Sequence, residues 1–174
     1  AAVAIERFRP ERIFSTGICG CYMEDATLLG TAVIGTQAIF ADTGAAGPVT
    51  FISLETMGLP LCKTARGTIY NGIFLDDSPG PATVPRTQFL TISSVSDSHA
   101  AAKKLCLRFP SAEGLLRCED MESAAIALIA FRSGIPCTVV RGISNICGQR
   151  DRAAWKITEA AQAAQEALYS MLQK

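Results

Sequence analysis

The chain has 174 residues, of which 49% are hydrophobic and 18% are charged, and its sixteen basic side chains balance sixteen acidic ones. This length and apolar content predict one folded domain and exclude a disordered chain. Because a net charge of zero offers no basic field for a polyanion, we expect neither a nucleic-acid partner nor a membrane surface. Small-molecule chemistry is therefore the leading expectation.

The first half of the chain is expected to contain one helix and several strands. Apolar side chains at positions 1, 4, 5 and 8 predict a helix over residues 1–8, with no capping residue before it. Segments rich in valine, isoleucine and threonine predict strands at residues 12–18, 31–40, 69–75 and 87–95. The proline- and glycine-rich residues 76–85 predict a surface loop.

Helices and strands are expected to alternate in the second half. The helices are expected at residues 98–109, 122–133 and 154–172, and the strands at residues 115–119 and 136–143. Such alternation implies parallel crossovers in an α/β sheet, and the earlier hairpin-like strands make that sheet mixed. We therefore expect a single α/β domain over residues 1–174, with a mixed central sheet flanked by helices.

Cysteine and histidine usage argues against a metal centre. Seven cysteines are scattered along the chain, at positions 19, 21, 62, 106, 118, 137 and 147. Several lie in apolar runs, which predicts buried thiols in a reducing cytoplasm. There is no Cys-x-x-Cys pair, and His99 is the one histidine, so we expect no metal ion. His99 begins a predicted helix, where a solvent-facing or capping role is the simpler interpretation than a catalytic triad.

One glycine-containing group and three polar groups follow the apolar runs, where ligands of α/β sheets usually bind. They are residues 17–20 (GICG), 96–98 (SDS), 119–122 (EDME) and 144–145 (SN). Each group also has a structural interpretation: a turn, a helix N-cap, a favourable charge at a helix N-terminus, and a loop cap, respectively. Because the acidic group and Asn145 end strands joined by one crossover, we expect them at the same edge of the sheet.

The chain resembles a known superfamily through one long motif. The motif at residues 119–157 is similar to the ligand-binding half of the purine nucleoside phosphorylase and nucleosidase superfamily. Its sequence is EDMESAAIALIAFRSGIPCTVVRGISNICGQRDRAAWKI. The phrases RGISN-x-x-G-x-RDR-x-x-W and FISLETMGLPL look most like the futalosine hydrolase family, and STGICG matches the family's glycine-containing strand end. This resemblance runs the length of the chain and implies a nucleoside phosphorylase-like fold.

The resemblance also has one departure. Relatives begin with a further segment that supplies the first strand and a glutamate that activates the attacking water, so we expect N-terminal strands of the family fold to be missing here. Asp42 or Asp97 could replace that glutamate, without a spacing argument for either.

The resemblance implies how the ribose is held. Cleavage of a ribosyl C1′–N9 bond passes through an oxocarbenium-like sugar, which requires a bound ribose, a good leaving group and a positioned water. Glu122 matches the family glutamate that accepts hydrogen bonds from ribose hydroxyls, and Met121 matches a methionine that lies against sugar and base. A core methionine is the alternative for Met121. Asp120, Cys19 and Gly20 are also expected to contact the substrate, and no cofactor is implied.

Asn145 is expected to select the base. Nucleosidases that act on methylthioadenosine and S-adenosylhomocysteine carry an aspartate here, which protonates N7 and accepts from the 6-amino group. A carboxamide instead donates to a 6-oxo oxygen and accepts from a protonated N7. The residue therefore favours a 6-oxopurine nucleoside, of which futalosine is one; its cleavage to hypoxanthine and dehypoxanthine futalosine belongs to menaquinone biosynthesis.

Futalosine carries a carboxyphenyl ketone at its 5′ side. The resemblance places Trp155 at an aromatic wall of the 5′ pocket, with an anchor for the last helix as the alternative. Arg150 or Arg152 could pair with the benzoate, or both could form an ion-pair network with Asp151. Phe51 resembles a segment that reaches the adjoining subunit's pocket in relatives, which implies a homodimer.

Three alternatives to a futalosine hydrolase stay open. One is a methylthioadenosine/S-adenosylhomocysteine nucleosidase, although its relatives carry an aspartate where this chain has Asn145. A purine nucleoside phosphorylase would need a cationic cradle for phosphate, whereas the basic residues here are scattered. A non-catalytic nucleoside-binding remnant would follow if the water-activating glutamate were truly absent.

Overall fold

A computed structural model describes residues 1–47, 50–111 and 115–173. Its centre is a mixed six-stranded sheet in the order β10-β1-β9-β8-β2-β7, and an additional pairing of β10 with β2 curls the sheet back on itself. The strands of this sheet are β1 (Ile13–Cys21), β2 (Ala32–Phe40), β7 (Gly72–Phe74), β8 (Arg86–Thr91), β9 (Leu116–Asp120) and β10 (Cys137–Ile146). The predicted fold class, a mixed α/β sheet flanked by helices, is confirmed.

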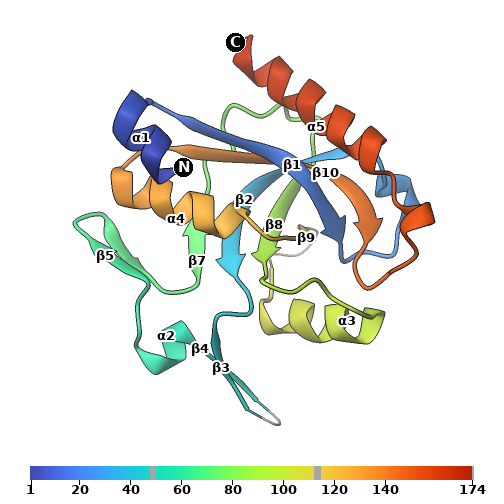
Figure 1. Cartoon of the computed structure of the whole chain (residues 1–174), viewed down its shortest axis with the longest axis horizontal. Coiled ribbons are helices and arrows are strands. Elements are labelled where there is room, and N and C mark those ends of the chain that lie inside the picture. The colour runs from blue at the N-terminus through green and yellow to red at the C-terminus, as the bar shows by residue number, and fades with distance from the viewer. Residues whose placement is uncertain (48–49, 112–114, 174) are drawn as a thin grey trace.

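Helices surround the sheet, and two short hairpins project from it (Figure 1). The helices are α1 (Ala2–Phe8), α2 (Leu54–Met57), α3 (His99–Arg108), α4 (Ser123–Ser133) and α5 (Ile157–Leu172), with single 3-10 turns at η1 (Ala26–Leu28) and η2 (Arg152–Ala154). The hairpins pair β3 (Gly44–Ala46) with β4 (Phe51–Ser53) and β5 (Cys62–Thr64) with β6 (Gly67–Ile69). Among the described residues, no helix has the length and apolar character that crossing a bilayer requires.

Helices α4 and α5 cover opposite faces of the sheet. Successive side chains of a strand point to opposite faces, and Val139 of β10 packs in the core that contains the α4 alanines. The next residue, Val140, packs in the core that contains Ala164 and Met171 of α5. Each helix buries a stripe of mainly small side chains at helical spacing, so each lies close to the strands beneath it.

The ends of the strands differ from the predicted ones. The strand predicted over 12–18 continues to Cys21, and the one predicted over 136–143 continues to Ile146. The GICG and SN groups therefore lie within strands rather than after them. The reason is that the parallel backbone pairing of β1 with β10 runs beyond the apolar residues, from Ile13↔Cys137 to Cys21↔Ile146.

Two other strand predictions are also corrected. The segment predicted as one strand over 69–75 is divided between β6 and β7, because the Asn71 side chain turns the chain by donating to the carbonyls of Phe40 and Thr43. The strand predicted over 87–95 ends at Thr91 as β8.

The predicted crossovers are only partly correct. β8 and β9 are parallel neighbours joined through α3, as expected. β9 and β10 are not neighbours, because β1 lies between them and pairs antiparallel with β9 only at its last two residues. The acidic group and Asn145 thus approach each other across the end of β1.

Burial controls the chemistry of the cysteines. All seven are free thiols, six of them are buried as predicted, and Cys62 is the half-buried exception. Burial raises the pKa of the Cys19 and Cys147 thiols and raises that of Cys137 to about 11. Because the thiolate is the reactive form, the buried thiols are inert in the folded chain.

We predict that Gly142→Ala destabilises the fold far more than Gly17→Ala. A methyl group at Gly142 would overlap the backbone of Ala160 in α5, whereas at Gly17 the nearest atom, Cδ of Arg141, would lie 3.6 Å away. Urea unfolding should show a loss above about 2 kcal/mol for Gly142→Ala and below about 1 kcal/mol for the control. Equal losses would show that α5 does not pack directly on β10.

We also predict a single fast-reacting thiol. In native protein treated with iodoacetamide at pH 8, Cys62 should be alkylated at least about tenfold faster than Cys137, since the raised pKa of Cys137 keeps it protonated. Peptide mass spectrometry over time measures both rates, and urea-unfolded protein serves as the control in which they become similar. Fast labelling of Cys137 in the native state would contradict the packing described.

Candidate active site

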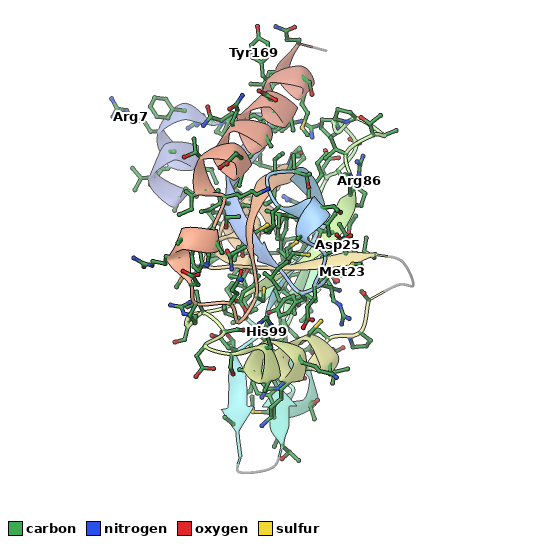
Figure 2. The ribbon with its side chains drawn as sticks, turned by 90° about the vertical axis from the view of Figure 1, so that its right-hand side faces the viewer. Arg7, Met23, Asp25, Arg86, His99 and Tyr169 are labelled. Atoms are coloured by element: carbon green, nitrogen blue, oxygen red, sulfur yellow. The ribbon has the colours of Figure 1, made fainter. Side chains whose placement is uncertain are left out.

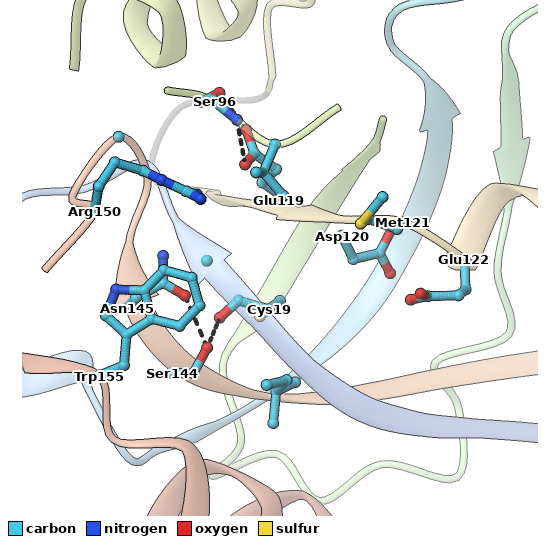
Figure 3. A pocket seen from close by; sticks show the side chains of 14 residues that line it. Cys19, Ser96, Glu119, Asp120, Met121, Glu122, Ser144, Asn145, Arg150 and Trp155 are labelled. Atoms are coloured by element: carbon cyan, nitrogen blue, oxygen red, sulfur yellow. Dashed lines mark hydrogen bonds between the residues drawn. The ribbon is translucent and has the colours of Figure 1, made fainter. Parts of the chain in front are cut away.

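A cavity of about 390 Å³ opens where the ends of β1, β9 and β10 meet (Figure 3). Seven of the eight predicted substrate-contacting residues line it, namely Cys19, Gly20, Asp120, Met121, Glu122, Asn145 and Trp155. Figure 3 shows Asn145 and Trp155 on one side of the end of β1, and Asp120, Met121 and Glu122 on the other. The expectation that the acidic group and Asn145 share one edge of the sheet is confirmed by this common cavity.

A register shift aims Asn145 at the cavity. Cys19 pairs with Ile143 and Gly20 pairs with Asn145, so Ser144 is the extra residue in β10. Because side chains alternate between faces, one extra residue moves Asn145 to the face it would otherwise avoid. Its Oδ1 accepts from Ser144 Oγ at 2.8 Å, and its Nδ2 donates to the Ile146 carbonyl at 3.2 Å. These contacts fix the plane of the carboxamide.

Gly20 leaves the floor of the cavity bare. A Cβ atom there would lie 2.9 Å from Cys147 Sγ and 3.2 Å from Asn145 Nδ2. Any larger residue would therefore displace the Asn145 amide. The need for glycine at this position comes from close packing rather than from a turn, because residue 20 lies within β1.

Glu122 lies at the other end of the cavity, where its carboxylate has no ion-pair partner among the described residues. It is exposed and is the N-cap of α4, but its side chain makes no capping hydrogen bond. Met121 beside it is 48% exposed, so the core-methionine alternative is wrong for this residue. The positive end of the α4 dipole favours the charge of Glu122. The carboxylate is thus available to accept hydrogen bonds from the hydroxyls of a ligand.

Asp120 lies in the cavity wall, but its oxygens are engaged by the protein. It accepts from Thr91 Oγ1 at 2.7 Å and from Ser123 Oγ, and it forms an ion pair with Arg141 in which Nε and Oδ2 are 3.3 Å apart. Both side chains of the pair are buried. Ser123 begins α4, so Asp120 ties the start of that helix to the sheet and thereby holds Glu122 in place.

Arg141, which is not among the described residues that line the cavity, supports Asp120 from behind, and the sequence did not single it out. Its guanidinium crosses over Gly17 of the neighbouring strand and donates to Ser15 Oγ at 3.2 Å. The available signal was a lone charge in an otherwise apolar strand, which requires a buried partner. Asp120 supplies that partner.

Glu119 was predicted only as a member of the acidic group at residues 119–122, without a role of its own. It is 7% exposed and lines the cavity, and it accepts from the Ser96 backbone N–H at 3.1 Å and from the Tyr22 hydroxyl at 2.9 Å. Burial, reinforced by the Glu119 charge, raises the pKa of Tyr22. Within the SDS group, Ser98 is the N-cap of α3, as its structural interpretation predicts, whereas Ser96 lines the cavity.

Trp155 and Arg150 form the remaining wall. The indole donates to the Gln149 carbonyl at 3.2 Å, and the Arg150 guanidinium lies 5.9 Å from the centre of the indole ring. Arg152 is not among the described residues lining the cavity, and Asp151 caps η2. Neither arginine forms an ion pair with Asp151 within the described part of the chain, so the predicted ion-pair network is not found.

Phe51 is the predicted residue that lies away from this cavity. It belongs to β4, where its ring packs edge-on against Phe109 with 6.5 Å between centres and lies 4.6 Å below the Arg108 guanidinium. Its expected contact with an adjoining subunit stays a prediction.

His99 begins α3 and is 57% exposed, in keeping with its solvent-facing interpretation (Figure 2). Across residues 1–47, 50–111 and 115–173, no group of three or more His, Cys, Asp or Glu side chains is placed to hold a metal ion.

Known proteins are similar to this chain in sequence and in fold. The model of the phosphorylase superfamily matches residues 1–174. A futalosine hydrolase from Acidothermus cellulolyticus is 31% identical over 134 residues, which cover 74% of this chain and 52% of that relative. A futalosine hydrolase from Streptomyces coelicolor is 32% identical over 164 residues, covering 90% of this chain and 63% of the relative. The chain thus spans less than two thirds of the length of either relative.

A solved structure shares the fold at lower identity. The S-adenosylhomocysteine nucleosidase from Streptococcus pyogenes, in complex with 5-methylthiotubericidin, matches with a TM-score of 0.75 at 20% identity. The match covers 99% of this chain and 71% of that one.

Proposed function

We propose, because the chain belongs to the phosphorylase superfamily, that it is a purine nucleosidase that hydrolyses the N-ribosidic bond of a 6-oxopurine nucleoside, with futalosine as its substrate. The observation that carries this proposal is that a free carboxylate, Glu122, and a fixed carboxamide, Asn145, line one cavity. The two relatives that are named futalosine hydrolases support the choice of substrate.

The ribose would lie at the Glu122 end. Charge-assisted hydrogen bonds from the sugar hydroxyls to this carboxylate contribute on the order of 1.5 to 3 kcal/mol each. Met121, exposed beside Glu122, offers a polarizable surface to the sugar. Because the developing oxocarbenium ion is positive, the nearby negative charge stabilises the transition state more than the ground state.

The base would lie at the Asn145 end, over Gly20. The amide N–H donates to the 6-oxo oxygen, and the amide oxygen accepts from N7 once that nitrogen is protonated. Holding the protonated base makes it a better leaving group, which is the main chemical demand of the reaction. Trp155 would lie against the aryl group on the 5′ side, and an indole provides a large apolar surface for it.

The charges of the cavity favour water over phosphate as the nucleophile. Among the described residues that line it, Arg150 is the one cation, against the carboxylates of Glu119, Asp120 and Glu122. A phosphate dianion would need several cations or backbone N–H groups around it. A phosphorylase is therefore less well supported than a hydrolase.

An adenine-releasing nucleosidase is the second candidate. The match to the nucleosidase structure with 5-methylthiotubericidin supports it at the level of the fold alone. Asn145 distinguishes the two candidates, since an amide beside N7 suits a 6-oxopurine better than adenine. A non-catalytic nucleoside-binding protein is the third candidate, and turnover assays distinguish it from the two enzymes.

Assembly and location belong to the same proposal. Phe51 lies outside the cavity of its own chain, which is consistent with a homodimer in which it reaches the partner. Seven free cysteines support a reducing cytoplasm. The products, hypoxanthine and dehypoxanthine futalosine, would place the reaction in menaquinone biosynthesis.

The direct test is a comparison of nucleosides. Chromatography of the released bases should give kcat/KM at least about tenfold higher for futalosine or inosine than for adenosine or methylthioadenosine, a difference of about 1.4 kcal/mol. Added phosphate should leave the rate unchanged and yield no ribose 1-phosphate. A clear preference for adenine nucleosides, or a phosphate-dependent rate, would replace the proposal by one of its alternatives.

A single substitution tests the role of Asn145. Asn145→Asp should lower kcat/KM for inosine relative to adenosine by at least about tenfold, because a carboxylate repels the 6-oxo oxygen and accepts from a 6-amino group. The matched control is Gln149→Glu, the same change of amide to carboxylate at a nearby residue that is not in the cavity lining. If both variants keep the wild-type ratio, Asn145 does not contact the base.

A further inference from the structure

Arg150 differs in charge from the other ionised residues of the cavity. Among the described residues that line it, Arg150 is positive, whereas Glu119, Asp120 and Glu122 are negative. The buried Arg141 already pairs with Asp120. No carboxylate in the described part of the chain forms an ion pair with Arg150. The charge of Arg150 is therefore available to a ligand.

The loop that carries Arg150 is held in place by its own turn and by α3. Gln149 donates its backbone N–H to the Ile146 carbonyl at 3.1 Å, which closes the turn. Gly148 in this turn has a φ of +85°, and a Cβ atom there would overlap the backbone nitrogen of His99 at the start of α3. Because the loop packs this closely, little entropy is lost when a ligand binds to the side chain it presents.

The Arg150 guanidinium lies beside an apolar surface that is also fixed. The indole of Trp155 donates to the Gln149 carbonyl at 3.2 Å, and Cζ of Arg150 lies 5.9 Å from the centre of the indole ring. Figure 3 shows the two side chains on the same side of the end of β1, with Arg150 extending toward that strand. A positive charge and a flat apolar face thus border one part of the cavity.

This combination of side chains fits an aryl carboxylate. An aromatic ring packs on an indole with about 4.5 to 7 Å between ring centres, so a carboxylate on that ring comes within reach of the guanidinium. Arginine donates two parallel hydrogen bonds to a planar carboxylate, which the ammonium group of a lysine does not match. The three carboxylates of the cavity repel an anion at other positions, which leaves Arg150 as its partner.

We infer that Arg150 is a specificity-determining residue that selects nucleosides with an aryl carboxylate on their 5′ side and pairs with that carboxylate at the face of Trp155. The inference rests on the proposed function, because it takes a nucleoside as the ligand of the same cavity, and futalosine belongs to this class. Arg152, the other arginine that the sequence left open for this role, is not among the described residues that line the cavity. Without this role, Arg150 would only cover the indole.

A comparison of two ligands on the unmodified protein tests the inference independently of how any variant folds. Futalosine carries a carboxylate, and its methyl ester keeps the aryl ring but lacks the charge. The value of kcat/KM should be at least about tenfold higher for futalosine, since the ester forms no charge-assisted hydrogen bonds. Added sodium chloride should reduce this ratio, because it screens an exposed charge pair. Equal values for the two ligands would overturn the inference.

Substitution of Arg150 identifies the residue responsible. Arg150→Ala should lower the ratio of kcat/KM between futalosine and its methyl ester to about one, mainly through KM for futalosine, and Arg150→Lys should restore only part of it. The matched control is Arg152→Ala, which removes the same charge from an exposed side chain outside the described cavity lining and should keep the wild-type ratio. An unchanged ratio in Arg150→Ala, or an equal loss in both alanine variants, would show that Arg150 does not bind the carboxylate.

Calorimetry and hydrolysis assays run in parallel separate this inference from the proposed function. If futalosine binds more tightly than its methyl ester but neither is cleaved, the inference stands and the proposed function fails. If both are cleaved equally well, the proposed function stands and the inference fails. If the protein binds neither nucleoside, both are overturned.

Discussion

The one-residue register shift at Ser144 is the constraint on which the candidate site depends. It allows β10 to stay paired with β1 while turning the Asn145 side chain toward the cavity. In an unshifted ladder, alternation would send that side chain to the opposite face. The contact of Ser144 Oγ with the Cys19 carbonyl at 3.1 Å and with the Asn145 amide holds the shifted residues in place. The bare backbone of Gly20 completes the space that a base would occupy.

A buried ion pair fixes the other end of the cavity. Asp120 and Arg141 are both almost fully buried, and breaking such a pair by removing one partner costs about 3 to 5 kcal/mol. Asp120 also accepts from Ser123 at the start of α4. The exposed carboxylate of Glu122, one residue earlier, thus stands on a helix whose first turn is anchored to the sheet. The ion pair that supports the site is buried, whereas Glu122 is exposed and Asn145 is half-buried.

The sequence predicted the fold class and the positions of most helices and strands, because buried faces leave a periodic apolar pattern. It also predicted seven residues that line the cavity, five through the long motif around Glu122 and Asn145, and Cys19 and Gly20 through the STGICG match. It did not predict that β1 and β10 continue to Cys21 and Ile146, since hydrogen-bonded pairing, and not apolar side chains, extends them. The shift at Ser144 has no signature in its composition. Phe51 lies away from the cavity, and its expected role at an adjoining subunit stays a prediction.

A complex with an uncleavable nucleoside tests the central claim most directly. In 9-deazainosine a carbon–carbon bond replaces the N-ribosidic bond, so a crystal structure would show the bound ligand intact. The account predicts ribose hydroxyls within hydrogen-bonding distance, about 2.6 to 3.0 Å, of the Glu122 carboxylate. It also predicts that the base lies over Gly20, with its O6 and N7 edge at Asn145. A nucleoside bound elsewhere, or turned so that its ribose meets Asn145, would contradict it.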